Sequence, residues 1–217
     1  MSERGIDRHP TIERYRLGTR ANHWLVAITF VLAALSGLSL FHPALYPLSG
    51  VLGGGTWTRI LHPFLGVVMA VAFLFLALGL WRDNLLVARD RAWLKQLPKV
   101  LDNEEEDLPP VGRFNGGQKL LFWVLVLALL VLVLSGLVIW RVYFSHLFPI
   151  GVIRFAALAH AVFGLVLVCA IVVHVYAAFW IKGSLGAMTE GKVTYGWARQ
   201  HHRLWFRDVL AGRRKPD

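Results

Sequence analysis

The sequence predicts an all-α integral membrane protein, a bundle of four transmembrane helices. Three observations lead to this prediction. Hydrophobic residues make up 56% of the 217 residues, and the mean hydropathy is +0.54, which is too apolar for a soluble domain of this length. Four uncharged runs have the length of about 20 residues that a helix needs to cross a bilayer. The basic residues are concentrated in alternate connections between these runs, as in membrane proteins with a cytoplasmic side.

We expect each of the four uncharged runs to be one membrane span, because each lacks Asp, Glu, Lys and Arg. The runs are residues 22–41, 61–81, 120–140 and 155–181. Pro43, Pro47 and the consecutive glycines Gly53–Gly55 predict a loop between the first two spans. The fourth run is long enough to tilt or to protrude from the bilayer. We expect residues 1–217 to form a single membrane domain.

The distribution of lysine and arginine predicts the orientation. Five precede the first span, seven lie from Arg82 to Lys119 and eight follow from Lys182 onward, which together are 20 of the 23. Only Arg59, Arg141 and Arg154 lie in the other two connections. Since basic residues favour the cytoplasmic side, both termini of this multi-pass membrane protein are predicted to be cytoplasmic.

Two segments on the predicted cytoplasmic side mix apolar with cationic residues. Residues 87–101 and residues 190–211 both show this pattern. Such segments are typical of helices that lie along a membrane surface. We therefore expect an interfacial helix in each of them.

Charge and cysteine content exclude several classes of function. The formal net charge is +10, but the basic residues flank apolar runs, which favours a membrane orientation signal over binding of nucleic acid. The single cysteine, Cys169, excludes an intrachain disulfide, a covalently attached haem and a four-cysteine iron–sulfur cluster. Any haem must therefore be held noncovalently.

Four of the nine histidines lie within or at the edges of the predicted spans, where ionisable residues are candidates for function. They are His23, His62, His160 and His174. In the predicted topology His23 and His174 share an inner level, while His62 and His160 share an outer level. On the fourth span His160 and His174 are about 21 Å apart along the helix and about 40° apart around it. This arrangement predicts two stacked b-type haems, each ligated by a pair of neutral imidazoles.

Small residues support this prediction. The residue four positions after each of the four histidines is small: Ala27, Gly66, Gly164 and Ala178. A flat porphyrin needs such room, although small residues also serve ordinary packing between membrane helices. The tetrapeptide Leu-Ser-Gly-Leu occurs at residues 35–38 and again at 134–137. It hints at a duplicated helix pair, but a repeat this short easily arises by chance, so it is given no weight.

Alternatives remain for the histidines. His42 is the rival of His62, which we prefer because Pro63 suits the first turn of a helix. His146 lies in the other outer connection, and His9, His201 and His202 lie in polar segments. The four span histidines could also be hydrogen-bonding residues of a purely structural anchor, or zinc or copper ligands of a metal transporter.

Several motifs together resemble the cytochrome b (gamma) subunit of respiratory formate dehydrogenase, over nearly the whole chain. They are Asn22-His23-Trp24, Gly37-Leu38-Ser39, Arg59-Ile60-Leu61-His62-Pro63-Phe64, Phe114-Asn115-Gly116-Gly117-Gln118-Lys119, Ile139-Trp140-Arg141, Ala178-Phe179-Trp180-Ile181-Lys182-Gly183-Ser184 and Glu190-Gly191-Lys192-Val193. The resemblance implies that His62 and His160 ligate an outer haem, and His23 and His174 an inner haem. The histidine pattern also suits the cytochrome b of another oxidoreductase, such as a hydrogenase.

The resemblance further implies partners and a substrate. Electrons would come from an iron–sulfur (beta) subunit fed by a molybdenum or tungsten catalytic (alpha) subunit, and would reduce menaquinone or ubiquinone near the cytoplasmic side. This transfer would contribute to the proton-motive force of anaerobic respiration. The implied quinone site includes Asn115, with Gly117 and Gln118 beside it. From the residues alone, the favoured role of Asn115 is that of the N-cap of the third span.

Overall fold

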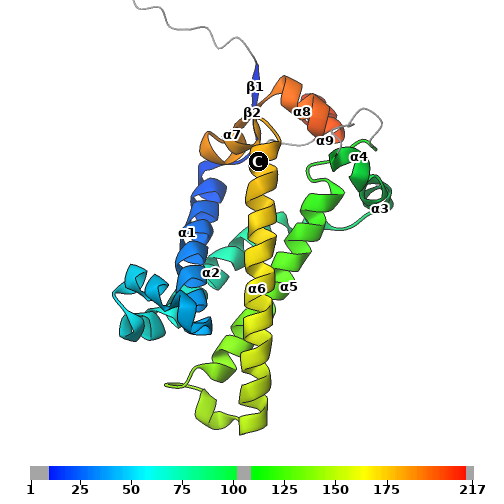
Figure 1. Ribbon diagram of the computed structural model, residues 1–217. Coiled ribbons are helices and arrows are strands. Elements are labelled where there is room, and N and C mark those ends of the chain that lie inside the picture. Colours follow the sequence, from blue (N-terminus) through cyan, green and yellow to red (C-terminus); the bar gives the residue numbers. More distant parts are fainter. Residues whose placement is uncertain (1–9, 102–108, 214–217) are drawn as a thin grey trace, which may run out of the picture. The chain divides into compact units, whose positions relative to one another are not determined.

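Four long helices dominate the computed structural model, which describes residues 10–101 and 109–213 (Figure 1). They are α1 (Leu17–Phe41), α2 (Gly55–Leu80), α5 (Gly116–Ile139) and α6 (Ile150–Trp180). All four are long and apolar enough to cross a membrane. Large hydrophobic side chains such as Phe75, Leu158 and Phe179 are more than 60% exposed on them. An apolar exterior is what lipid requires, so the four predicted spans are confirmed as helices suited to a membrane.

The chain divides into two compact units. We call residues 21–80 and 121–175 the bundle unit, and residues 1–20, 81–120 and 176–217 the tail unit. The tail unit thus combines the three segments that hold most of the basic residues.

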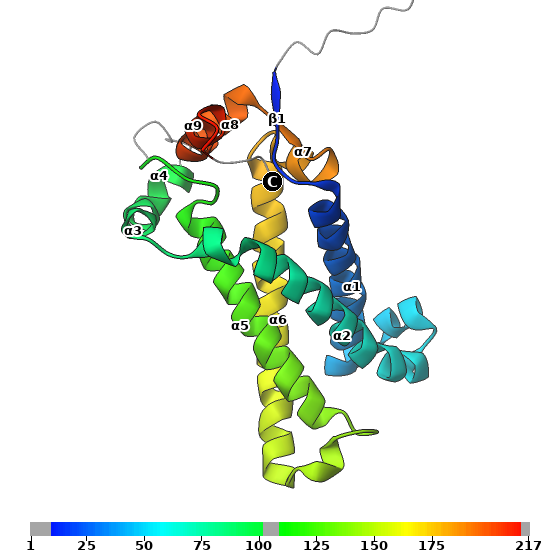
Figure 2. The same cartoon turned by 180° about the vertical axis from the view of Figure 1, so that it is seen from behind.

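In the bundle unit all four helices meet around one apolar layer. Its buried centre is Met69, Ala128, Leu129 and Leu167, and Val26, Phe30, Phe73, Leu125, Leu132 and Phe163 pack against it. Helices α5 and α6 run side by side in both views (Figures 1 and 2). A polar tie joins α1 to α2, since Asn22 Nδ2 donates to the Ala72 carbonyl at 2.8 Å.

The start of α2 differs from the prediction. The helix begins at Gly55, so Pro63 lies inside it and not in its first turn. The expected loop before it is the 3-10 helix η1 (Pro43–Leu52), which ends at Gly53 with a φ of 85°. The sequence suggested a later start because consecutive glycines are typical of a loop. In the structure Gly55 packs against Tyr46, and the Tyr46 hydroxyl would lie 2.6 Å from a Cβ added at Gly55.

The tail unit contains a small sheet that the all-α prediction missed. Strand β1 (Thr11–Glu13) pairs antiparallel with β2 (Lys192–Thr194), with Ile12 opposite Val193. Gly191 leads into β2 with a φ of 84°, and its carbonyl accepts from the backbone N–H groups of Arg14 and Tyr15. An added Cβ at Gly191 would lie 2.7 Å from the Tyr15 carbonyl, so the approach of the two segments requires glycine.

The two predicted interfacial helices are broken into shorter elements. Residues 87–101 form α3 (Ala88–Lys95) and α4 (Leu97–Leu101), and residues 190–211 form β2, α8 (Tyr195–His201) and α9 (Arg203–Leu210). The remaining short elements are η2 (Trp81–Asn84), η3 (Ser145–Leu147) and α7 (Ser184–Thr189). Single long helices there were the wrong prediction, because tertiary contacts fix turns that the apolar periodicity does not signal.

Candidate functional site: two histidine pairs and a capped helix start

The first histidine pair joins α2 to α6. The ring centres of His62 and His160 are 6.2 Å apart, with the planes at 76°. The Ser36 hydroxyl lies 2.8 Å from His62 Nδ1, and the Ser135 hydroxyl lies 3.0 Å from His160 Nδ1. Both histidines are therefore held by a serine from another helix of the bundle unit, α1 for His62 and α5 for His160.

The second histidine pair joins α1 to α6. The ring centres of His23 and His174 are also 6.2 Å apart, with the planes at 54°. His23 Nδ1 is buried and has no hydrogen-bond partner within the described residues. This pair therefore differs from the first one in how its rings are held.

The two pairs lie at different levels of the bundle. Along α6, Leu167 is seven residues from both His160 and His174, which is a rise of about 10 Å in each direction. Leu167 belongs to the buried apolar layer of the bundle unit, so an apolar layer separates the pairs. The structure thus brings the four span histidines together in the two pairs that the depth argument anticipated.

The glycines four residues after His62 and His160 have open space where a side chain would be. A Cβ added to Gly66 would meet no protein atom within 4 Å, and one added to Gly164 would meet only Leu132 Cδ2, at 4.0 Å. Both positions can therefore accommodate a flat group against the helix, as the sequence suggested.

The other histidines are placed elsewhere. His42 is exposed and caps η1, where its Nδ1 accepts from the Ala44 N–H at 3.1 Å, and His146 is exposed in η3. His9 lies outside the described residues. His202 was predicted to lie in a polar segment, yet it is only 2% exposed, and its Nδ1 lies 2.9 Å from the Gly112 carbonyl. Burial lowers the pKa of His202 well below its usual range, and the positive charge of Arg14 lowers it further.

In the tail unit, Asn115 is the N-cap of α5, as the residue-based alternative held. Its Oδ1 accepts from the Gln118 N–H at 2.8 Å, and the Gln118 Oε1 accepts from the Asn115 N–H at 3.0 Å. This reciprocal pair is a capping box. Gly117 packs against Trp93, whose ring would lie 3.2 Å from an added Cβ. The three residues predicted for the quinone site are therefore close together in the structure, and the contacts observed for each of them are structural.

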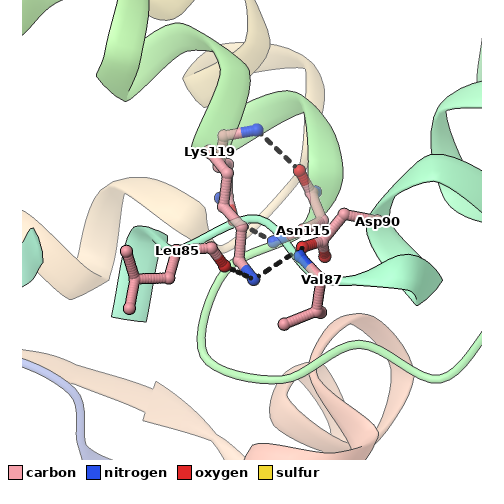
Figure 3. Close-up of polar contacts among 6 residues, drawn as sticks. Leu85, Val87, Asp90, Asn115 and Lys119 are labelled. Atoms are coloured by element: carbon pink, nitrogen blue, oxygen red, sulfur yellow. Dashed lines mark hydrogen bonds and ion pairs between the residues drawn. The ribbon is translucent and has the colours of Figure 1, made fainter. Parts of the chain in front are cut away.

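A buried ion pair lies one turn after this cap (Figure 3). Lys119 Nζ lies 2.8 Å from Asp90 Oδ2, and the two side chains are 7% and 5% exposed. Lys119 also donates to the Leu85 carbonyl at 3.0 Å, and Asp90 accepts from the Val87 N–H at 2.8 Å. These bonds tie α3 to the start of α5 and satisfy two groups that would be costly to bury alone.

Comparison with protein families decides what kind of protein carries these pairs. Residues 14–191 match the family described as prokaryotic cytochrome b561. The chain belongs to this family. A cytochrome b carries b-type haem, so the cytochrome b561 match establishes a haem-binding electron-transfer protein, and with the four apolar helices a multi-pass membrane protein.

Comparison with individual proteins gives a more specific similarity than the family match. The chain is 44% identical over 204 residues to the formate dehydrogenase cytochrome b556(fdo) subunit of Escherichia coli strain K12, covering 94% of this chain and 96% of that one. It is 42% identical to the nitrate-inducible cytochrome b556(Fdn) subunit of the same strain, over 91% of each chain. It is 39% identical to the formate dehydrogenase cytochrome b556 subunit of Haemophilus influenzae, over 100% of this chain and 91% of that one. The predicted resemblance is thereby confirmed.

The spacing of both pairs fits a b-type haem of this family. An imidazole nitrogen binds a metal at about 2.0–2.1 Å, and C–N bonds of about 1.33 Å place ring atoms about 1.1 Å from the ring centre. Two imidazoles on opposite sides of one metal therefore have ring centres about 6.2–6.4 Å apart. The measured separation is 6.2 Å in both pairs.

The histidine pairs fit the zinc or copper site of a metal transporter less well than they fit haem. Zinc and copper ions are held by three or four side chains in most of their protein sites. No group of three His, Cys, Asp or Glu side chains with suitable spacing exists among the residues that the structure describes.

Sequence reasoning missed Ser36 and Ser135 as partners of the histidines. Each stands in the repeated tetrapeptide Leu-Ser-Gly-Leu, which is too short to carry weight from the sequence alone. The glycine of each copy also contacts the same ring: an added Cβ would lie 3.1 Å from His62 Cε1 at Gly37 and 3.3 Å from His160 Cε1 at Gly136. The repeat was the available signal, and its meaning is visible only when the helices are packed.

Proposed function

We propose that this chain is the electron-transfer membrane subunit of a formate dehydrogenase of the bacterial inner membrane. It takes electrons from a periplasmic-side iron–sulfur (beta) subunit, which a molybdenum or tungsten (alpha) subunit supplies from formate. It delivers them to menaquinone or ubiquinone near the cytoplasmic side, where both termini lie. The relatives named above are cytochrome b subunits of formate dehydrogenases, which supports this assignment over a hydrogenase.

Two b haems are proposed, one for each histidine pair. His62 and His160 hold the outer haem, and His23 and His174 hold the inner one. The observation that carries this proposal is the equal ring separation of 6.2 Å at two levels. Haem iron, when bound, supplies one-electron transfer. The chain contributes neutral ligands in a region without any Asp or Glu, because all 13 acidic residues lie outside the bundle unit.

Replacing the ligands one at a time tests the proposal. His62→Ala and His160→Ala should each lose the same haem, and His23→Ala and His174→Ala should each lose the other. The haem content should fall from two per chain to one, measured by reduced-minus-oxidised absorption spectra of the purified complex. His42→Ala is the control and should keep both haems. A colourless wild-type protein, or losses that do not follow the pairs, would contradict the assignment.

We propose that Asn115, together with Gly117 and Gln118, forms part of the quinone site. Oδ1 of Asn115 serves the helix cap, whereas the amide N–H groups are donors suited to a quinone carbonyl. Protons for the quinol come from the cytoplasm.

Two substitutions separate the cap from the quinone site. Asn115→Asp keeps a capping oxygen but removes the amide donors, so it should leave the unfolding temperature unchanged and reduce quinone reduction at least several-fold. Asn115→Ala removes the cap as well and should also cost about 1 kcal/mol of stability. Activity is measured as formate-dependent reduction of a soluble quinone analogue. Wild-type activity of Asn115→Asp would leave Asn115 as a cap only.

The formate assignment has its own test. Affinity purification of the tagged chain from membranes should retrieve formate-oxidising activity, and electrons from formate should reduce the haems. Retrieval of hydrogen-oxidising activity in its place would support the hydrogenase alternative.

A further inference from the structure

The serines beside His62 and His160 show which ring nitrogen carries the proton. Ser36 Oγ lies 2.7 Å from the Leu32 carbonyl, and Ser135 Oγ lies 2.6 Å from the Val131 carbonyl. A carbonyl oxygen only accepts, so each hydroxyl donates its single hydrogen to its own helix. The hydroxyl oxygen can then only accept from the histidine Nδ1–H.

This assignment of donors and acceptors determines the tautomer of both imidazole rings. With Nδ1 protonated, Nε2 of His62 and of His160 carries the free lone pair, which is the form that binds a metal. The serine hydroxyls are buried, with Ser36 at 1% and Ser135 at 6% exposure. Water therefore does not compete for either hydrogen bond.

A glycine next to each serine makes a second close approach to the same ring. Gly37 and Gly136 follow the serines directly, and their Cα positions leave only 3.1 Å and 3.3 Å between an added Cβ and the histidine Cε1. Each ring is therefore in contact with a serine hydroxyl and lies close to the next residue's backbone, which restricts its rotation. Two copies of one tetrapeptide build the same support on α1 and α5.

The second pair lacks this arrangement. His23 Nδ1 has no hydrogen-bond partner among the described residues, and no serine is bonded to His174 there. A hydrogen bond accepted from Nδ1–H makes an imidazole a stronger electron donor to its metal and fixes its orientation. The two pairs therefore offer ligands of different donor strength.

We propose that Ser36 and Ser135 are positioning residues of the outer haem. They fix the Nε2-binding tautomer and the orientation of both axial imidazoles, and they lower the midpoint potential of that haem by increasing electron donation. The neutral hydroxyl increases donation without adding charge in a unit that contains no carboxylate. This inference rests on the proposed haem ligation, with His62 and His160 as one pair.

The test is potentiometric titration of the haems in the whole complex. Ser36→Ala and Ser135→Ala should keep two haems per chain but raise the midpoint potential of one, namely the haem that His62→Ala removes. The double variant should raise it further. Because the freed rings can turn, the EPR g values of the same oxidised haem should change as well, and those of the other haem should not.

The chain offers a matched control and a conservative rescue. Ser39 is also buried on α1, at 3% exposure, but among residues 10–101 and 109–213 its hydroxyl is bonded only to the Ser36 carbonyl. Ser39→Ala should leave both potentials unchanged. Ser36→Thr and Ser135→Thr keep the hydroxyl and should restore wild-type potentials and g values.

The outcomes distinguish this inference from the proposed function. A wild-type complex without two haems would overturn the haem ligation itself. Two haems with unchanged potentials in the alanine variants, or an equal shift in Ser39→Ala, would overturn the role of the serines and leave the ligation intact. Loss of the haem in an alanine variant supports the inference if threonine restores it and overturns it if threonine does not.

Discussion

At the scale of single residues, the small residues four positions after the histidines are the clearest feature of the sequence that relates to haem binding. Gly66 follows His62 by four residues and therefore lies one turn along the same face of α2. A Cβ added at Gly66 would have no protein atom within 4 Å. The sequence already indicated this room, because four small residues follow four histidines at one spacing. It could not distinguish room for a porphyrin from helix packing, which depends on what the neighbouring helices place there.

Gly66→Leu is expected to remove one haem. The new side chain would fill the space beside His62, so that a porphyrin could no longer lie against α2, and the haem absorbance should fall by about half. Gly79→Leu is the matched control, because Gly79 is also on α2 and also has no atom within 4 Å of an added Cβ. It should retain full absorbance. Equal losses in the two variants would mean that helix packing, and not haem space, explains Gly66.

At the scale of elements, the long helices and the short ones obey different rules. A span is decided by an uncharged run of sufficient length, since every backbone polar group must be satisfied within the helix in lipid. The short elements of the tail unit are decided by contacts between distant segments. Arg14 illustrates this: its guanidinium lies 4.3 Å from the Trp205 ring centre and donates to the Arg113 carbonyl.

His202 lies where α8 ends and α9 begins, and we expect it to make the stability of the tail unit depend on pH. Burial lowers its pKa well below the usual range, so the folded form is neutral, while the unfolded chain takes up a proton below about pH 6.5. The stability that depends on a neutral His202 is therefore complete above that pH and is lost as the pH falls below it.

We expect His202→Gln to flatten the pH dependence of unfolding. Between about pH 7.5 and 5.5 the wild-type protein should lose more stability than the variant, by at most about 1.4 kcal/mol per pH unit. Tryptophan fluorescence during thermal unfolding in detergent measures this. Trp205→Phe changes a buried neighbour that does not titrate, so it should lower the unfolding temperature without changing the slope. An unchanged slope in His202→Gln would refute the prediction.

At the scale of the whole molecule, topology is the property to be tested. The three basic segments belong to one compact unit, which is what a common cytoplasmic side requires. The only cysteine, Cys169, is exposed on α6 and can be replaced by serine to give a background for labelling.

Single cysteines at Gly50 and Gln200 should report opposite sides of the membrane. Both residues are exposed, in η1 and α8 respectively, and a Cβ at Gly50 meets no atom within 4 Å. In the Cys169→Ser background, Gly50→Cys should react with a membrane-impermeant thiol reagent in intact spheroplasts. Gln200→Cys should react only after permeabilisation. The reverse pattern would invert the predicted orientation and the direction of electron delivery.

The sequence by itself determined the four membrane helices and the pairing of their histidines. Apolar length is a local property, and a helix of known rise converts residue spacing into depth, so His23 with His174 and His62 with His160 could be matched in advance. Only the tertiary structure shows which side chains and carbonyl groups contact the histidines. Ser36 and Ser135 contact histidines 26 and 25 residues away, and His202 is buried against a carbonyl 90 residues away. Such contacts depend on which helix faces meet, and the repeated tetrapeptide that contains both serines does not specify its partners.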